Sequence, residues 1–284
     1  MNLYVSTIAF SGKEVSSLLK EAEAANYLLE FSSGLPHHVG INKLFEAYPH
    51  AKLAHNYFPA PKVPFVLNLA SENESIRRIS INHCIQGLKM SKKAGASFFA
   101  AHAGFCLDPD PAELGKRLKQ SDQIIDREKH WQIFIESVAE VLSTADDLEI
   151  DFYIENNVTA AMNINIHGQN PLLCSHYREM MRLIHDMPHP RLGILLDTAH
   201  LKVSAMTLPF DLNAAMKDLH YYISAIHHSD NDGLLDSNQA IPKDYWFAPF
   251  MPHFRNIPQV LEVKAIEVEQ INQQLELLVS FAED

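Results

Sequence analysis

Six short apolar segments of the chain end in histidine, aspartate or glutamate, side chains that can bind a metal ion or carry a proton. The clearest is GILLDTAH, in which Asp197 closes an apolar run and His200 follows three residues later. One such ending is typical of a strand that simply leaves the core, but six endings of the same kind favour a shared function. They supply His55, His102, Glu155, Asp197 with His200, His227 with Asp230, and Glu262.

These side chains predict a metal centre. Imidazole nitrogens and carboxylate oxygens are the ligands that zinc, manganese and iron take in proteins. Four carboxylates and four histidines gathered in one place could not all ionise without a cation, because like charges at close range raise one another's energy. The sequence therefore predicts a divalent metal, either zinc, manganese or iron, at the point where the six segments meet.

The elements that must position these residues alternate along the chain. Eight segments have the apolar character of buried strands, and the stretches between them show the periodicity of amphipathic helices, as in residues 76–95, 130–147 and 266–283. Ser11 with Glu14, and Ser71 with Glu74, have the spacing of capping boxes and predict two helix starts. The predicted strands are 3–10, 27–31, 51–55, 97–102, 150–155, 192–197, 222–228 and 259–263.

Eight strands that alternate with helices predict an α/β protein with a parallel sheet, closed into one (β/α)8 TIM barrel that spans residues 1–284. An open doubly wound sheet is the alternative, but its usual glycine-rich turn does not follow the first strand. In a barrel the carboxyl ends of all strands meet at one mouth, where active sites form. Because strand side chains alternate, we expect His227 to point inward and His228 to point away from the barrel axis.

Composition narrows the class of partner. The 284 residues include 35 acidic and 23 basic side chains, a formal net charge of −12, and no basic patch is visible. This balance disfavours nucleic acid and anionic membrane surfaces. Three cysteines without CxxC spacing, no signal peptide and no apolar run of about 20 residues predict a cytoplasmic protein.

The strand ends, read in order as LAHNYF, FAAHAG, YIENN, LLDTAH, AIHHSDNDG and VLEV, resemble the xylose isomerase-like TIM-barrel superfamily. That superfamily includes endonuclease IV and the sugar-phosphate isomerases and epimerases. The resemblance extends from the first strand to Glu262 and implies between one and three metal ions. It implies that Glu155, Asp197, His227 and Glu262 form the single-metal set of the epimerases.

Other positions follow from the same resemblance. His200 falls on a position that binds substrate or a further metal, and His55 and His102 resemble two extra histidines of the endonuclease IV type. In that type an Asp-x-His pair follows the seventh strand. This chain has Asp236 but carries Asn238 where histidine is expected, and a neutral amide is a poor ligand for a transition metal.

Two enzymatic functions compete. The first is isomerisation or epimerisation of a small sugar or sugar phosphate through an enediolate, with Glu155 and Glu262 as general base and acid and His200 on a substrate oxygen. The alternative is endonuclease IV-type hydrolysis of a phosphodiester at a multinuclear zinc site, which the negative charge and Asn238 disfavour. A binding module on a degenerate barrel is a third interpretation, disfavoured because the ligand set is nearly complete.

Two loops have open roles. Residues 56–65 form a proline-rich aromatic segment that either covers the substrate, with Lys62 attracting a phosphate, or is a rigid connection. The aromatic segment 245–254 is either a packed helix or a contact between subunits of a homo-oligomer, with a substrate wall as the weaker option. Lys62, Asp230 and Asn238 are the predicted substrate-binding residues.

Overall fold

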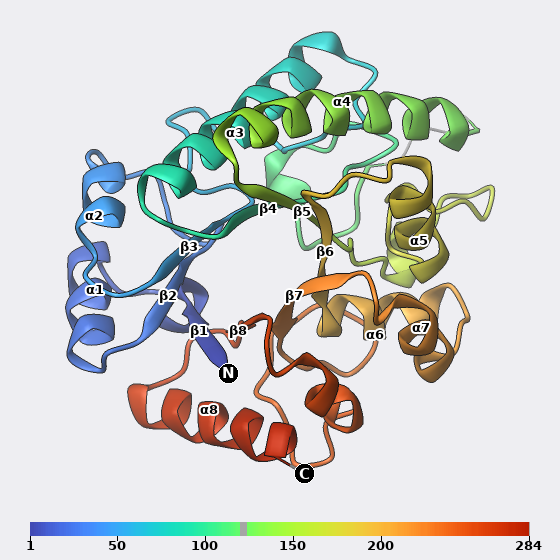
Figure 1. Ribbon diagram of the computed structural model, residues 1–284. Helices are drawn as coiled ribbons and strands as arrows, with labels where there is room; N and C mark the ends of the chain where they lie inside the picture. The colour runs from blue at the N-terminus through green and yellow to red at the C-terminus, as the bar shows by residue number, and fades with distance from the viewer. Residues whose placement is uncertain (120–123, 284) are drawn as a thin grey trace.

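Eight parallel strands close into a barrel in the computed structural model, which describes residues 1–119 and 124–283 (Figure 1). Each strand pairs with the next along the chain, and the last pairs with the first. The predicted TIM barrel is therefore confirmed. The strands are β1 (Asn2–Ser6), β2 (Leu28–Phe31), β3 (Lys52–His55), β4 (Phe98–His102), β5 (Asp151–Glu155), β6 (Leu192–Asp197), β7 (Ile223–His228) and β8 (Pro258–Leu261).

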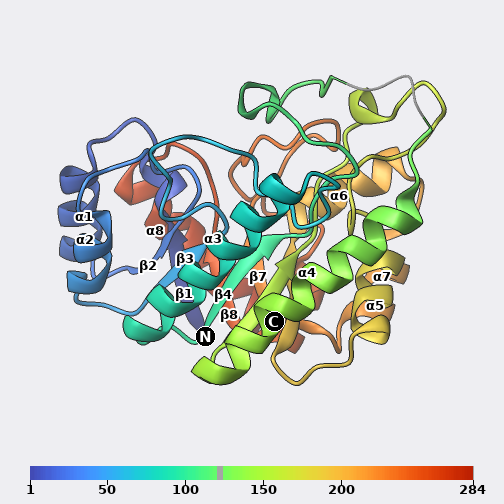
Figure 2. The same ribbon diagram turned by 90° about the horizontal axis from the view of Figure 1, so that it is seen from above.

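Helices surround the barrel (Figure 1). They are α1 (Val15–Ala24), α2 (Ile41–Ala47), α3 (Glu74–Lys93), α4 (Arg127–Leu148), α5 (Tyr177–Asp186), α6 (Thr198–Thr207), α7 (Leu212–Leu219) and α8 (Val268–Glu283). In the described part of the chain, 3-10 helices lie in the connections: η1 (Thr7–Phe10), η2 (Pro111–Glu113), η3 (Ala161–Asn163) and η4 (Ala248–Phe254). In Figure 2 the long connection after β4 projects on the side of the barrel opposite the N-terminus. Within the described residues, we find no helix with the length and apolarity that a membrane crossing requires.

Three local predictions are wrong. The first strand ends at Ser6, and the next four residues form η1, because a short apolar run does not distinguish a buried strand from a buried helical turn. Helix α1 begins after Glu14 without a side-chain cap, so the box with Ser11 does not form.

The cap of α3 comes from a different residue than the predicted box. Asn73 accepts hydrogen bonds from the backbone N–H groups of Ser75 and Ile76. Ser71 instead contacts Asp108, and its hydroxyl accepts a bond from the Asn73 N–H. Asparagine is as good an N-cap as serine, so both residues were suitable by type and only the backbone path selects between them.

The barrel interior has two layers that follow from strand alternation. A lower layer is apolar and comprises Tyr4, Leu28, Leu53, Ala100, Tyr153, Leu195, Ala225 and Val260. A second layer, here called the polar ring, lies above the first on the same face of the sheet. Each of its residues comes two positions after a residue of the apolar layer, either within the strand or just past its end. The polar ring comprises Ser6, Glu30, His55, His102, Glu155, Asp197, His227 and Glu262. The apolar layer thus forms the floor beneath the predicted metal ligands.

Candidate metal centre

Glu155 lies at the centre of the polar ring. Its Oε2 is 2.6 Å from Nε2 of His55 and 3.3 Å from Nε2 of His102. Its Oε1 is 3.5 Å from Nδ1 of His227 and 3.6 Å from Nδ1 of His200. Side chains from the ends of three other strands and from the first turn of α6 therefore converge on one carboxylate, as expected from strands that meet at a common mouth.

Potential metal ligands form overlapping groups within the polar ring. In each group the ligand atoms all lie within 4.8 Å of one another. Glu155 belongs to two groups, so its two oxygens could serve two ions. The first group, here called the four-ligand set, consists of Glu155, Asp197, His227 and Glu262. The second, here called the three-ligand set, consists of His55, His102 and Glu155. The third consists of Glu30, His55, His227 and Glu262.

Buried polar atoms without a hydrogen-bond partner show that this donor set fits a metal ion. Leaving such an atom buried and unpaired costs roughly 1–3 kcal/mol, and here several of them face the same space. Such atoms include Glu155 Oε1, Asp197 Oδ2 and His227 Nδ1, which belong to residues of the first group. A divalent cation bound there would satisfy these nitrogen and oxygen atoms together.

The charges of the polar ring also indicate that a cation fits there. Burial raises the pKa of the Asp197 carboxyl to about 8, an effect that His200 opposes and that the carboxylates of Glu262 and other neighbours reinforce. Burial alone would raise the pKa of Glu155 too, but His102 and His55 outweigh it and hold that pKa well below its usual range. The carboxylates thus share the ring only when positive charge is present, either as protonated histidine or as a metal ion.

Glu30 is a site residue that the sequence analysis missed. It is fully buried, and its Oε2 lies 2.8 Å from Nε2 of His227. Donation from Nε2–H to Glu30 leaves Nδ1 of His227 facing Glu262, whose Oε2 is 2.9 Å away. Carboxylates that hold a metal-binding histidine in this way fix its tautomer and ring orientation. Glu30 is the penultimate residue of β2, so a search limited to the last residue of each strand finds Phe31 instead. The alternation of side chains places Glu30 on the same face as Leu28 and was the signal that could have identified it.

His200 and Asp236 extend the centre toward solvent. Asp197 caps α6 by accepting a bond from the backbone N–H of His200 at 2.7 Å, which holds that helix start against the ring. Nδ1 of His200 donates to the carbonyl of Asn156 at 2.9 Å, and Nε2 lies 3.3 Å from Oδ2 of Asp236. His200 therefore presents its Nε2 side to Asp236 rather than to Glu155.

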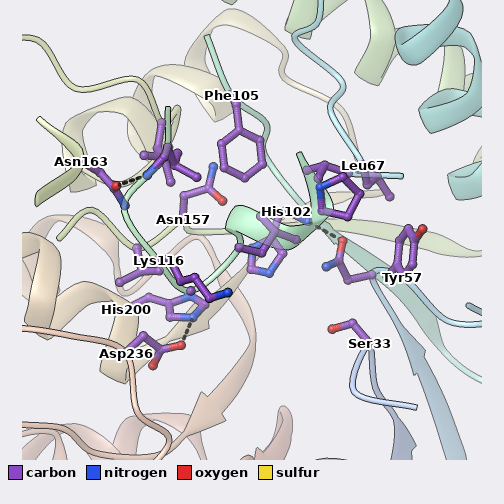
Figure 3. Close-up of a pocket in the computed structure, with 18 of the residues that line it drawn as sticks. Ser33, Tyr57, Leu67, His102, Phe105, Lys116, Asn157, Asn163, His200 and Asp236 are labelled. Carbon is purple, nitrogen blue, oxygen red and sulfur yellow. Dashed lines mark hydrogen bonds and ion pairs between the residues drawn. The ribbon is translucent and has the colours of Figure 1, made fainter. Parts of the chain in front are cut away.

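A cavity of about 570 Å³ adjoins this part of the centre (Figure 3). His102, His200 and Asp236 belong to its wall, and the predicted covering loop contributes Tyr57 and Phe65. The loop after β3 therefore forms part of the wall. The aromatic segment 245–254 instead packs inside the protein, with Tyr245 and other rings buried against α8.

The structure does not bring the three predicted substrate-binding residues to this cavity. Lys62 is exposed and absent from the wall. Asp230 is held by Lys202 of α6, with Nζ 2.6 Å from Oδ1. Asn238 also lies outside the wall, and its backbone carbonyl accepts a bond from the N–H of Lys264. For Asp230 the reason is local, because a residue just past the strand end can turn toward a neighbouring helix.

His228 lies where alternation predicts. Its Nδ1 is 3.1 Å from the hydroxyl of Tyr245, and its Nε2 is 2.9 Å from Oε1 of Gln259. Neither partner belongs to the polar ring, so consecutive histidines of β7 face opposite sides of the barrel wall.

Sequence comparison places the chain in a known family. The family described as xylose isomerase-like TIM barrel matches residues 40–275, so this chain belongs to that family. A curated relative is the probable endonuclease 4 of Mesomycoplasma hyopneumoniae strain J. It is 22% identical over 232 residues, covering 76% of this chain and 73% of the relative.

Solved structures similar to this one include both enzyme types. A D-tagatose 3-epimerase-like protein superposes with a TM-score of 0.73 at 16% identity, covering 100% of this chain and 97% of the other. D-psicose 3-epimerase from Clostridium cellulolyticum gives a TM-score of 0.68 at 14% identity, covering 100% and 98%. Endonuclease IV from Thermus thermophilus gives 0.61 at 16% identity, covering 100% and 99%. At these identities the similarity demonstrates the shared fold.

Proposed function

We propose that the protein is a metal-dependent isomerase or epimerase that acts on a small sugar or sugar phosphate. The observation that carries the proposal is the four-ligand set of Glu155, Asp197, His227 and Glu262. A cavity of about 570 Å³ lies next to it, with His102 and His200, which both contact Glu155, in its wall. Cavities of roughly 300–1,000 Å³ are typical of small-molecule sites. Epimerases among the similar structures support the same class of reaction.

The roles of the side chains follow from their positions. A divalent ion bound by the four-ligand set would polarise adjacent substrate oxygens and so make the carbon-bound hydrogen more acidic. Glu155 and Glu262 both approach Nδ1 of His227, at 3.5 Å and 2.9 Å, and would exchange the proton as base and acid. His200, at the cavity wall, would hold a substrate oxygen.

Solvent isotope exchange tests this proposal. Protein loaded with zinc, manganese or iron is incubated in D2O with ketoses and ketose phosphates, and deuterium at the carbon beside the carbonyl is measured. We expect exchange by the native protein and a loss of about 100-fold in Glu262→Gln, which removes one acid–base group. Glu267→Gln is the matched control, because that carboxylate is exposed and outside the ring. Absence of exchange with the whole panel would contradict the proposal.

A second candidate is a multinuclear zinc phosphodiesterase of the endonuclease IV type. The three-ligand set of His55, His102 and Glu155 favours it, because it adds a second cluster that shares Glu155 with the first. The relationship to probable endonuclease 4 also supports it. The net charge of −12 opposes duplex binding, which depends on cationic contacts to phosphates.

Metal stoichiometry and DNA incision distinguish the two candidates. One ion per chain favours the isomerase, and two or three favour hydrolysis. We expect no binding to duplex DNA with an abasic site at physiological salt, and no incision. Incision by catalytic amounts of zinc-loaded protein that disappears in Glu155→Gln would replace the first candidate with the second.

A further inference from the structure

The cavity beside the metal centre has two unlike ends. We infer that the substrate is amphipathic: a sugar or other hydroxy-carbonyl compound that carries an apolar acyl, alkyl or aromatic substituent. This inference rests on the proposed function for the oxygenated end of the substrate. It adds the chemical nature of the other end, which the cavity wall determines.

The polar end coincides with the metal centre. His102, His200 and Asp236 reach the cavity wall, and their side chains are 24%, 8% and 23% exposed. Figure 3 shows His102, His200 and Asp236 around the same space. Hydroxyl and carbonyl groups of a substrate therefore find donors and acceptors at this end.

The other end of the wall is apolar. Val66, Phe105, Leu118 and Leu172 form a small cluster of their own, separate from the barrel core, and all four also line the cavity. They come from the connections after three different strands, β3, β4 and β5. Met162 and Leu114 line the cavity as well, half-buried and exposed respectively.

Side-chain amides near the apolar end already have partners. Nδ2 of Asn157 donates to the carbonyls of Gly104 and Leu173, at 2.9 and 2.8 Å. Oδ1 of Asn163 accepts from the backbone N–H of Leu118 at 3.0 Å. These amides hold loops together, so the hydroxyls of a simple sugar would lose their water here without equivalent replacement.

Charge at the wall argues against a phosphate as the distal group. Lys116 is the single lysine or arginine among the described residues of the wall, and its Nζ donates to the carbonyl of Ala112 at 3.2 Å. Phosphate sites commonly combine several charged or backbone donors. An apolar substituent needs no such donors, and its burial against this wall is favourable because it removes apolar surface from water.

A pair of hydroxamates tests the inference without requiring turnover. Acetohydroxamate and hexanohydroxamate present the same two adjacent oxygens to a bound metal and differ only in tail length. Their dissociation constants for the zinc-loaded protein are measured by titration calorimetry. We expect the longer tail to bind at least ten times more tightly, since each added methylene can be buried in the cavity.

Matched substitutions locate the tail. Met162→Asp places a charge in the cavity wall, whereas Met206→Asp makes the same change at a 69% exposed residue outside it. We expect the preference for the longer tail to fall below threefold in Met162→Asp and to remain in Met206→Asp. Leu114→Asp, at a 48% exposed residue of the wall, is a second test that carries little risk to folding.

Each outcome decides the inference. Equal affinities for the two hydroxamates would overturn it while leaving the metal centre intact. A tail preference that survives in both Met162→Asp and Leu114→Asp would also overturn it, because the tail would then bind elsewhere. If neither hydroxamate binds, no accessible metal lies beside the cavity, and the inference falls together with the proposed function.

Discussion

His227 and His228 follow one another in β7 and are both fully buried, yet their surroundings are opposite. Burial would lower the pKa of His227, but Glu30 and Glu262 outweigh it and raise that pKa well above the usual range. Burial lowers the pKa of His228 to about 3, beside the neutral Gln259. The comparison shows that burial alone yields a neutral imidazole. The demand for positive charge comes from the carboxylates on the inner face.

Removing a ligand from the inner face should have the largest effect. We expect His227→Ala and Asp197→Ala to weaken zinc binding by more than about 100-fold. Removing a residue that only hydrogen-bonds to a ligand costs about 10–100-fold, and loss of the ligand itself should cost more. His228→Ala deletes the same side chain on the opposite face and should leave zinc affinity within threefold. Equilibrium dialysis with metal analysis measures both. Equal loss of zinc in His227→Ala and His228→Ala would refute the contrast between the two faces.

Shortening the two glutamates should separate metal binding from proton transfer. Glu155→Asp and Glu262→Asp keep the charge but withdraw the carboxylate by roughly 1.5 Å, the length of one carbon–carbon bond. Proton transfer needs heavy atoms within about 2.6–3.2 Å, whereas a centre with several ligands can adjust. We expect both variants to retain metal while deuterium exchange falls about 100-fold. If both lose metal as completely as Asp197→Ala, the acid–base assignment has no support.

The acceptor of each histidine offers a finer comparison. Glu30→Ala removes the partner of His227, and Gln259→Ala removes the partner of His228. We expect Glu30→Ala to weaken zinc binding about tenfold, because the imidazole loses its orienting carboxylate. Gln259→Ala should lower the melting temperature without changing zinc affinity. Unchanged zinc affinity in Glu30→Ala would show that His227 needs no such support.

The smallest expected effect is a pH dependence of stability in metal-free protein. Asp197 has its pKa raised to about 8 from an ordinary value of 3.8, and His227 and His200 have theirs raised well above 6.5. Each group binds more protons when folded than when unfolded, so its stabilising contribution is lost as pH rises from its ordinary to its raised pKa. For Asp197 this interval is 3.8 to about 8, and for the two histidines it begins at 6.5. His228 has a lowered pKa, so it binds fewer protons in the folded state and reduces stability only as the pH falls below 6.5.

Zinc should remove this pH dependence, because the ion replaces the protons. Between pH 6.5 and 9 we expect the melting temperature of chelator-treated protein to fall relative to that of zinc-loaded protein. A change of 1 kcal/mol corresponds to about 2–4 °C in a protein of roughly this size. Parallel curves for the two forms would show that the ring does not require positive charge.

Much of the barrel was predictable because apolar runs and helical periodicity are local properties. Strands β3 to β7 each end where an apolar run gives way to histidine, aspartate or glutamate, which made these ends predictable. The side chains there meet as expected: His55, His102, Glu155, Asp197 and His227. Asp230 has the same residue type and a similar position, but Lys202 of α6 holds it away from the cavity. Residue type alone could not reveal that partner, since 28 positions separate the two.

By itself, the sequence determined the order of the strands, the two-residue alternation within them and the types of side chain at their ends. Only barrel closure decided which of these side chains touch. Glu30 and His227 are 197 positions apart, and they meet because strands from opposite parts of the chain line one narrow interior. Closure also placed Glu155 between two ligand sets and gave the adjoining cavity an apolar end. Alternation depends on neighbouring residues, whereas these contacts depend on the packing of the whole barrel.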